Sequence, residues 1–353
     1  MSTPAGSLPG DRKPAQAPKA LNLLLGTADD GFATLRVRDD AQSVDYILRG
    51  GIDLTPALSP GRFTPRLLYV QPGRNMQIGL GPGPIVNMTA EPDLCSQALQ
   101  KITEIVASSG RPCFNHPLAI TATTRDQVSR SLAGMPGLVV PKTVRVSARS
   151  GAELHLAMQE NALAFPVLVR STGTHGGSDM LRADAPEQLD SFFSADSGRL
   201  SVYLTEFHDF ASPDGLYRKY RIAVVGDEIF LRHVYIGADW LVHRVRRAPD
   251  TESQEAAALI RFDSGHAARL RPLLQDVARR LRLDFFGVDC SLAESGELLL
   301  FEANAQMRIL HNGDPSPSLW DAPIARIRAA VAARLATPRR WRCAKRAIVR
   351  RWS

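Results

Sequence analysis

Cysteine is scarce in this chain, and long apolar runs are missing. The 353 residues include four cysteines, widely scattered and with no C-x-x-C pair, which excludes a zinc ribbon or a disulfide framework. Apolar runs such as residues 329–333 fall far short of the roughly 18 residues that a membrane span needs. The first 20 residues lack the apolar stretch of a signal peptide. We therefore expect a cytoplasmic protein with reduced thiols.

Basic residues are concentrated at the C-terminal end. The formal net charge is +7, and residues 338–353 hold seven Arg or Lys and no acid, so the rest of the chain is about neutral. The composition thus gives no strong nucleic-acid signal. At helical spacing Trp341, Lys345, Ile348 and Trp352 form one stripe. We expect residues 337–353 to be a basic amphipathic tail that contacts an acidic partner or an anionic membrane surface, or else a solvated, disordered terminus.

The chain divides into a leader and a small first domain before its longer second part. Residues 1–20 are rich in Pro, Ala and Gly without periodic apolar positions, which predicts a disordered leader. Residues 21–115 are predicted to form a small α/β domain. Its expected elements are strands at 21–26, 66–71 and 83–88 and a helix at about 94–108, with Asp93 as N-cap and Gly110 at its end.

The second part is predicted to form two α+β subdomains, at 116–200 and 201–336. The first should contain a helix at 125–132, a strand within 137–146, a helix whose capping box is Ser150 and Glu153, and a buried strand at 165–170. The second should contain strands at 200–207, 220–226, 228–237 and 240–245 and helices at 266–283 and 324–335. The expected fold class is α/β (α+β).

Three oxygen-bearing side chains lie on a predicted hairpin, residues 285–307. With Ser295 and Gly296 as its loop, cross-strand partners have numbers that sum to 591, so Asp289 faces Glu302, and Asn304 lies on the same face. Opposed like charges destabilise a sheet unless a positive group lies between them. A magnesium ion is one interpretation, since it prefers hard oxygen ligands. Pairing with nearby arginines, or simple exposure, is the other.

A glycine-rich stretch, "RSTGTHGGSDM" (170–180), follows a predicted buried strand. Its backbone N–H groups, its hydroxyls and Arg170 suit a triphosphate, although it is not a Walker A sequence. A flexible surface loop is the simpler alternative. Further on, "YLTEFHDF" (203–210) predicts a strand ending in Glu206 and Phe207, where backbone groups can bond the rim of a base. An ordinary strand end is the alternative there.

Taken in order, these segments resemble the ATP-grasp superfamily. The glycine-rich loop, the strand ending in "TEF", then "KYRIAVVGDEIFLRH", "GVD" and "FEAN" are similar to its glutathione-synthetase-like branch of carboxylate–amine ligases over roughly residues 114–312. The small first domain, with its "NHP" at 115–117, looks like the domain that precedes this fold. The resemblance implies a nucleotide site between two α+β subdomains, with ATP and Mg²⁺ as cofactors. It implies an ATP-dependent ligase that activates a carboxylate as an acyl-phosphate and joins it to an amine, with amino acids or peptides as substrates.

The resemblance also implies site residues. Asp289, Glu302 and Asn304 match magnesium ligands, Arg221 matches an arginine that contacts phosphate and the acyl-phosphate, and Arg232 stands where a further phosphate-side arginine is usual. The implied nucleotide-binding positions are Arg170, Thr172, Gly173, Thr174, Gly176, Gly177, Glu206 and Phe207. Lys142 is a further candidate for the nucleotide, or a solvated strand lysine. His243 and His311 are candidates for the acceptor pocket, or ordinary surface or core histidines.

The sequence departs from the family pattern at three places. One is "EANAQM" (302–307), which replaces the more usual Asn-Pro or Asn-Ser-Pro continuation and indicates an unusual acceptor side. Arg170 stands where a lysine usually binds the α- and β-phosphates, and that exchange keeps the charge without being neutral. Lys219 stands where related ligases often have an acid near the ribose, which leaves Asp209 and Asp214 as candidates for that role. Two other functions stay open, namely an ATP-grasp small-molecule kinase and a non-catalytic nucleotide-binding regulatory or scaffold protein.

Overall fold

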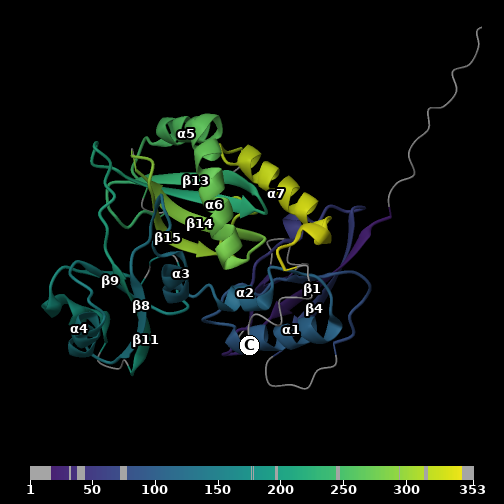
Figure 1. Cartoon of the computed structure of the whole chain (residues 1–353), viewed down its shortest axis with the longest axis horizontal. Helices are drawn as coiled ribbons and strands as arrows, with labels where there is room; N and C mark the ends of the chain where they lie inside the picture. Colours follow the sequence, from purple (N-terminus) through teal and green to yellow (C-terminus); the bar gives the residue numbers. More distant parts are fainter. Residues whose placement is uncertain are drawn as a thin grey trace, which may run out of the picture.

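A computed structural model describes most of the chain, and three sheets organise it (Figure 1). The described residues are 17–31, 33–37, 44–71, 78–175, 177, 179–194, 198–243, 247–293, 295–313 and 317–343, with side chains left out at 33–37 and 44–48. None of the helices in these ranges is long and apolar enough to cross a membrane. In Figure 1 the first unit lies at the lower right, the second at the lower left, and the third above both.

The first unit is a parallel sheet of order β4-β1-β5-β6, against which α1 packs. Its elements are β1 (Lys19–Gly26), β2 (Ala33–Val37), β3 (Val44–Leu48), η1 (Thr55–Ala57), β4 (Phe63–Val70), β5 (Ile85–Asn87), α1 (Ser96–Ser109) and β6 (Cys113–Phe114). Helix α1 ends at Gly110, whose φ of 61° favours glycine. The predicted N-cap is wrong, because Asp29, not Asp93, accepts from the amides of Ser96 and Gln97.

The second unit is an antiparallel sheet of order β10-β9-β11-β8, covered by α4. Its elements are β8 (Thr143–Ala148), α4 (Gly151–Glu160), β9 (Val167–Ser171), β10 (Leu181–Ala183), η2 (Pro186–Phe192) and β11 (Leu200–Glu206). Ser150 caps α4 by accepting from the amide of Glu153 at 3.3 Å. The predicted boundary at 200/201 falls too early, because β11 lies inside this sheet between β9 and β8.

The third unit is a sheet of order β13-β12-β14-β15-β7. Helices α5, α6 and α7 pack on β13, and α6 and α7 also on β12 (Figure 1). Its elements are β7 (Leu138–Val139), β12 (Tyr217–Val225), β13 (Glu228–Gly237), α5 (Glu252–Arg261), the π-helical turn η4 (Phe262–His266), α6 (Ala267–Leu281), β14 (Phe285–Leu292), β15 (Leu298–Asn304), α7 (Asp321–Leu335) and η5 (Pro338–Arg340). Of the two preceding helices, α2 (Pro117–Thr121) packs on α1 of the first unit, and α3 (Arg125–Leu132) contacts β8, α6 and β15.

Two strand predictions differ from the structure. The single strand expected within 137–146 is split into β7 and β8, which belong to different sheets, with Pro141 between them. A proline has no N–H to donate to a ladder, so it suits the crossing between sheets. The strand expected at 240–245 is not formed at 240–243, and 244–246 lie outside the described residues.

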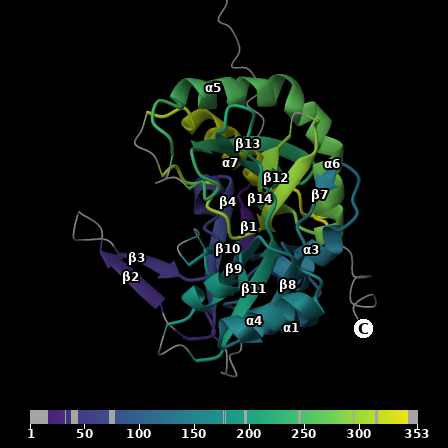
Figure 2. The same cartoon turned by 90° about the vertical axis from the view of Figure 1, so that its left-hand side faces the viewer.

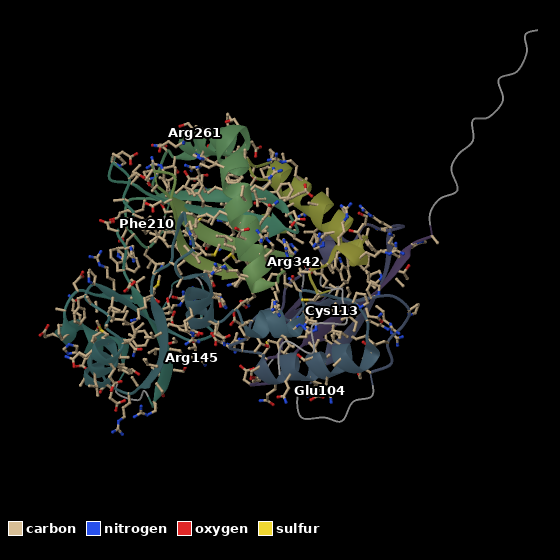
Figure 3. The ribbon with its side chains drawn as sticks, viewed as in Figure 1. Glu104, Cys113, Arg145, Phe210, Arg261 and Arg342 are labelled. Atoms are coloured by element: carbon tan, nitrogen blue, oxygen red, sulfur yellow. The ribbon has the colours of Figure 1, made fainter. Side chains whose placement is uncertain are left out.

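The two ends of the chain also differ from the predictions. Strand β1 begins at Lys19, inside the expected leader, and residues 1–16 lie outside the described ranges. Trp341 is 3% exposed and packs edge-on against Phe114 at 5.4 Å, while the amide of Arg342 donates to Asp284. Arg342 lies between α7 and the first unit (Figure 3). Residues 341–343 therefore pack against the fold and are not part of a free tail. The prediction of a basic tail now concerns residues 344–353, which lie outside the described residues.

A buried asparagine ties the first unit to the third. Asn115 is 1% exposed; its Nδ2 donates to the Phe285 carbonyl at 2.7 Å, and its Oδ1 accepts from the amides of Asp284 and Phe285 at 2.8 and 3.0 Å. These bonds fix the start of β14. The "NHP" motif thus anchors the strand that carries Asp289.

Candidate functional site

A pocket of about 530 Å³ lies where the three units meet, within the size range of small-molecule sites. Its walls come from α3, from β9 and β11 of the second unit, from β12, β14 and β15 of the third, and from the segment after β5 of the first. Figure 2 shows β9 and β11 below β12 and β14. Most of the site residues predicted from the sequence line this one pocket.

The β14–β15 hairpin places two of the predicted acids face to face. Asp289 pairs with Glu302, and Gly287 with Asn304, as predicted. Nearer the turn the pairing is offset by one residue, and a bulge at Phe301 restores the expected register. Bulges re-aim side chains, and the extra residue Phe301 lines the pocket. The one-residue offset near the turn and the bulge at Phe301 cancel each other. The predicted pairing of Asp289 with Glu302 is therefore confirmed.

Asp289 is neutralised by cations from β12. Arg221 Nε and Nη2 donate to its two carboxylate oxygens at 2.6 and 2.8 Å, and Lys219 Nζ lies 3.5 Å from Oδ2. Burial by itself raises the pKa of Asp289, but Arg221 and Lys219 outweigh it and lower the pKa to about 2. Burial opposes the charge on Arg221, yet Asp289 raises the pKa of Arg221 above its ordinary value. Asp289 is thus ionised at neutral pH.

Glu302 is neutralised by an arginine that the sequence interpretation missed. Arg125 Nη2 lies 2.6 Å from Glu302 Oε1. Burial raises the pKa of Glu302, but Arg125, Arg170 and His175 lower it overall. The alternative left open by the sequence, that arginines pair with these carboxylates, is what the structure shows for both acids.

Asn304 is not arranged as the predicted metal ligand. Its Oδ1 accepts from the amides of Gln306 and Met307 at 3.0 and 3.1 Å, and its Nδ2 donates to Glu302. Two backbone donors fix the orientation of the amide, so its oxygen caps the turn after β15. Asn304 therefore positions Glu302 and the following loop.

Asp289 and Glu302 fit a divalent cation that brings its other ligands. Mg²⁺ is commonly bound by one or two carboxylates together with phosphates and waters, and two directly opposed carboxylates meet that need. No group of three or more His, Cys, Asp or Glu able to hold a metal occurs within the described part of the chain. The residues that the structure describes thus supply an incomplete metal site.

Cations outnumber these two acids. Arg125, Arg170, Lys219 and Arg221 all line the same pocket. Burial, and then repulsion from Arg125, lowers the pKa of Arg170 to about 10. Arg170 is 8% exposed, and its Nε has no hydrogen-bond partner among the described residues. A buried guanidinium with an unpaired donor, such as that of Arg170, suits an anionic ligand.

The glycine-rich loop lies against the first unit. Gly173 has a φ of 70°, a Cβ there would come within 2.6 Å of Leu94, and the Gly173 amide bonds Asp93. Arg170 Nη2 donates to the Thr174 carbonyl at 2.5 Å. Of the predicted loop residues, those that line the pocket are Gly173, Thr174 and Gly177. Thr172 instead donates its amide to Ser201 and does not line the pocket, and Gly176 lies outside the described residues.

A histidine in this loop contacts acids on two units. His175 Nε2 lies 2.9 Å from Glu91 Oε2 in the first unit, and its Nδ1 lies 3.9 Å from Glu302 Oε1. Glu91 is 5% exposed. Asp93 is held beside it by Arg145 at 2.9 Å and by the Tyr203 hydroxyl at 2.6 Å. Figure 3 labels Arg145 on the second unit. The segment after β5 thus forms the surface on which the loop rests.

The far part of the pocket is apolar. Leu168, Phe207, Phe210 and Phe301 line it, with Phe210 and Phe301 at 4.7 Å between ring centroids, and Figure 3 labels Phe210 at the edge between the second and third units. The guanidinium of Arg182 lies 4.1 Å from the centroid of the Phe207 ring. These side chains form an apolar slot that is suited to a flat ring.

Two nucleotide predictions need correction here. The amides of Glu206 and Phe207 already donate to the carbonyls of Lys142 and Pro166, so these N–H groups are not available to a base, although both residues line the pocket. Lys142 itself does not line the pocket, because its Nζ donates to the Asn161 carbonyl. These two N–H groups join β11 to its neighbours, so the prediction of backbone contacts to a base is now limited to the carbonyls.

Arg232 also lies away from its predicted place. It is 4% exposed, does not line the pocket, and donates to the carbonyls of Ile309 and His311 at 3.3 and 2.6 Å. Neither candidate for the ribose lines the pocket: Asp214 pairs with Arg218, and Asp209 caps the amide of Ala211. Of the two candidate histidines, His243 lines the pocket and His311 pairs with Asp53.

Three pocket residues, Arg125, His175 and Glu91, were not predicted from the sequence, and only Arg125 has a local feature that could have indicated it. Arg125 is the first residue of α3, where the helix dipole disfavours a cation. A local rule broken without compensation often marks a functional position. His175 lies within the predicted glycine-rich loop, but no motif singles it out from its neighbours. Glu91 belongs to none of the sequence motifs considered above.

Comparisons with known proteins agree with this architecture. No protein-family model and no curated protein matches the sequence. Among solved structures, the VanG D-Ala:D-Ser ligase from Enterococcus faecalis has a TM-score of 0.53 at 12% identity, covering 91% of this chain and 98% of that one. The D-alanine–D-alanine ligase from Coxiella burnetii has a TM-score of 0.53 at 11% identity, covering 95% and 99%. The D-alanine–D-alanine ligase from Bacillus anthracis has a TM-score of 0.50 at 11% identity, covering 92% and 98%.

In this chain a small parallel α/β unit is followed by two α+β units, and a pocket lies where the three meet. This chain has the ATP-grasp fold.

Proposed function

We propose that the protein is an ATP-dependent ligase that activates a carboxylate as an acyl-phosphate and joins it to an amine. The observation that carries the proposal is the pair of opposed acids, Asp289 and Glu302, surrounded by four cations at the end of an apolar slot. The slot suits a nucleobase, and the cluster of cations around the two acids suits a triphosphate. The structurally similar proteins are ligases by name, which agrees with this assignment.

The nucleotide is proposed to lie with its base in the apolar slot and its phosphates toward Arg125, Arg170 and Arg221. Arg170 takes the place of the usual lysine, and its unpartnered Nε supports a role in binding phosphate. The glycine-rich loop, resting on the first unit through Gly173 and His175, covers the phosphates and keeps water from the reacting groups.

The chemistry follows from charge. A carboxylate is too stable for an amine to attack, so one of its oxygens first attacks the γ-phosphorus of ATP and ADP leaves. Arg125, Arg170 and Arg221 neutralise the phosphoryl oxygens while this occurs. A magnesium ion held by Asp289 and Glu302 would supply further charge neutralisation at the phosphates. The lone pair of the neutral amine then attacks the acyl carbon, and the bond between that carbon and the phosphate oxygen breaks. The nitrogen loses a proton to the departing phosphate, so that an amide and hydrogen phosphate are released.

The test is a turnover assay on the purified full chain with MgATP. The acids offered are the twenty proteinogenic L-amino acids, D-alanine and a set of dipeptides, and ADP, phosphate and new amides are followed by coupled absorbance and mass spectrometry. ADP with free phosphate and an amide supports the ligase. A phosphorylated small molecule supports the kinase instead, and binding of a fluorescent ATP analogue without any turnover supports the regulatory or scaffold alternative.

Two further properties belong to this proposal. All four cysteines are buried and unpaired, which supports reduced thiols and a cytoplasmic location. Residues 344–353, which carry four of the C-terminal basic residues, are proposed to contact an acidic partner or an anionic membrane surface. Because residues up to Cys343 belong to the fold, deletion should start at residue 344, and loss of salt-sensitive binding to anionic vesicles is the expected result.

A further inference from the structure

The loop after β15, residues 305–311, presents one arginine to the pocket. Arg308 is exposed and lines the pocket, and the described residues offer it no hydrogen-bond or ion-pair partner. It follows Asn304 by four residues, so it lies beyond the strand that carries Glu302. An unpaired cation facing a pocket is a candidate for contact with an anionic ligand.

Arg308 differs in this respect from the other pocket cations. Arg125 pairs with Glu302, and Arg221 and Lys219 share Asp289. Arg170 donates to a loop carbonyl beside the phosphate position. These four already provide positive charge for a triphosphate. Arg308 is therefore available for the second anion that a carboxylate ligase must bind.

The backbone on both sides of Arg308 is fixed. Met307 is 6% exposed, and its amide donates to the Asn304 side chain; Ile309 is 1% exposed, and its carbonyl accepts from Arg232. A Cβ on Gly287, in the neighbouring strand, would collide with Met307, so glycine there leaves room for the loop.

Two further arginines hold the next residues. Arg328 Nε donates to the Leu310 carbonyl at 2.8 Å, and Arg232 Nη2 donates to the His311 carbonyl at 2.6 Å. His311 Nε2 in turn lies 2.9 Å from Asp53 of the first unit. The loop thus buries Met307, Ile309 and Leu310 and leaves Arg308 exposed on a fixed backbone. A fixed backbone lowers the entropy lost when a ligand binds.

We infer that Arg308 binds the carboxylate of the acid substrate and that Arg232 is a positioning residue for the loop that carries it. This inference rests on the proposed ligase function. A guanidinium matches a carboxylate with two parallel hydrogen bonds, which a lysine cannot reproduce. The first unit contributes through Asp53 to the placement of this contact.

The test compares wild-type protein with Arg308→Ala, Arg308→Lys and Arg232→Lys. The control is Arg261→Ala, which removes an exposed arginine on α5 that does not line the pocket (Figure 3). Two quantities are measured on the full chain. One is the KM for whichever of the twenty L-amino acids or D-alanine best supports phosphate release, and the other is the Kd of a fluorescent ATP analogue with magnesium.

For Arg308→Ala we expect the KM for the acid to rise about 10- to 100-fold, with the Kd of the ATP analogue within about twofold of wild type. Arg308→Lys should recover part of that loss. Arg232→Lys should raise the KM about fivefold with little change in kcat, because lysine cannot hold both carbonyls. Arg261→Ala should match wild type.

The possible failures are distinct. If phosphate release depends on the acid and Arg308→Ala leaves the KM unchanged, the inference is wrong and the proposed function stands. If Arg308→Ala weakens the ATP analogue tenfold instead, Arg308 binds nucleotide and the inference is also wrong. If no acid supports phosphate release by the wild-type protein, the proposed function fails and the inference fails with it.

Discussion

Replacing Asp289 with asparagine should destabilise the metal-free protein. Two acids placed face to face would ordinarily repel each other, so removing one charge should relieve the fold unless cations of the chain already neutralise it. Arg221 binds both carboxylate oxygens of Asp289, and Lys219 approaches one of them. The sign of the stability change therefore shows whether the chain itself neutralises this acid.

The magnitude follows from the pKa of Asp289. The pKa falls from an ordinary 3.8 to about 2, and that difference corresponds to about 2 kcal/mol of stability. The Asp289 side chain is only 5% exposed, so screening by solvent reduces this stabilisation little. Because the folded-state pKa lies below the unfolded one, the stabilisation is complete above about pH 4 and is lost as the pH falls toward 2.

Thermal unfolding in EDTA is the assay, and Asp214→Asn is the matched control. For a chain of 353 residues we expect Asp289→Asn to lower the Tm by roughly 3 °C at pH 7, and the difference in Tm from wild type to narrow below about pH 4. Asp214 forms the same two-pronged pair with Arg218, but on the surface, so its replacement should change the Tm much less. A higher Tm for Asp289→Asn in EDTA would refute the reasoning.

Three other substitutions test the site and its support. Glu302→Gln should reduce ATP turnover at least about 100-fold while the circular dichroism spectrum stays unchanged, because the amide keeps the shape but not the charge; near-normal turnover would contradict the site assignment. Gly173→Ala should weaken binding of an ATP analogue about tenfold, because its Cβ meets Leu94, whereas Gly134→Ala, with a φ of 72° and open space around it, controls for backbone strain alone. Asn115→Ala should lower the free energy of unfolding by about 3 kcal/mol in urea denaturation, since it removes three buried hydrogen bonds; a change below about 1 kcal/mol would show that this anchor is dispensable.

The sequence predicted helices well where the periodic spacing of apolar residues and the capping residues indicated the same helix boundaries. Residues 125–132, the capping box at Ser150 and the helix end at Gly110 all appear as expected, because each depends on neighbours within one or two turns. The prediction of a single strand within 137–146 was wrong because it depends on residues far away in the sequence. Whether β7 and β8 share a sheet is decided by distant partners, since β7 pairs with β15 and β8 with β11.

The candidate site could be predicted only in part. The hairpin fixed Asp289 opposite Glu302, because cross-strand register follows from a short stretch of chain. The partners of these acids come from other elements, Arg125 from α3 and His175 from the glycine-rich loop, and no local pattern joins such residues. Arg232 was misplaced because a family position does not say which way a side chain points.

The C-terminal segment shows the same limit. Spacing alone placed Trp341 on a basic, amphipathic stripe, but in the fold its ring packs on Phe114 and its Nε1 donates to the Arg334 carbonyl at 2.8 Å. A buried aromatic contributes through apolar contact that only the tertiary structure provides.

Oxygen transfer from the substrate acid to phosphate is the most direct test of the central claim. The purified protein is given MgATP, the acid that best supports turnover with both carboxylate oxygens labelled as ¹⁸O, and an amine, and the released phosphate is analysed by mass spectrometry. If an acyl-phosphate forms in this pocket, each phosphate carries one ¹⁸O atom. Unlabelled phosphate released together with ADP would contradict the account.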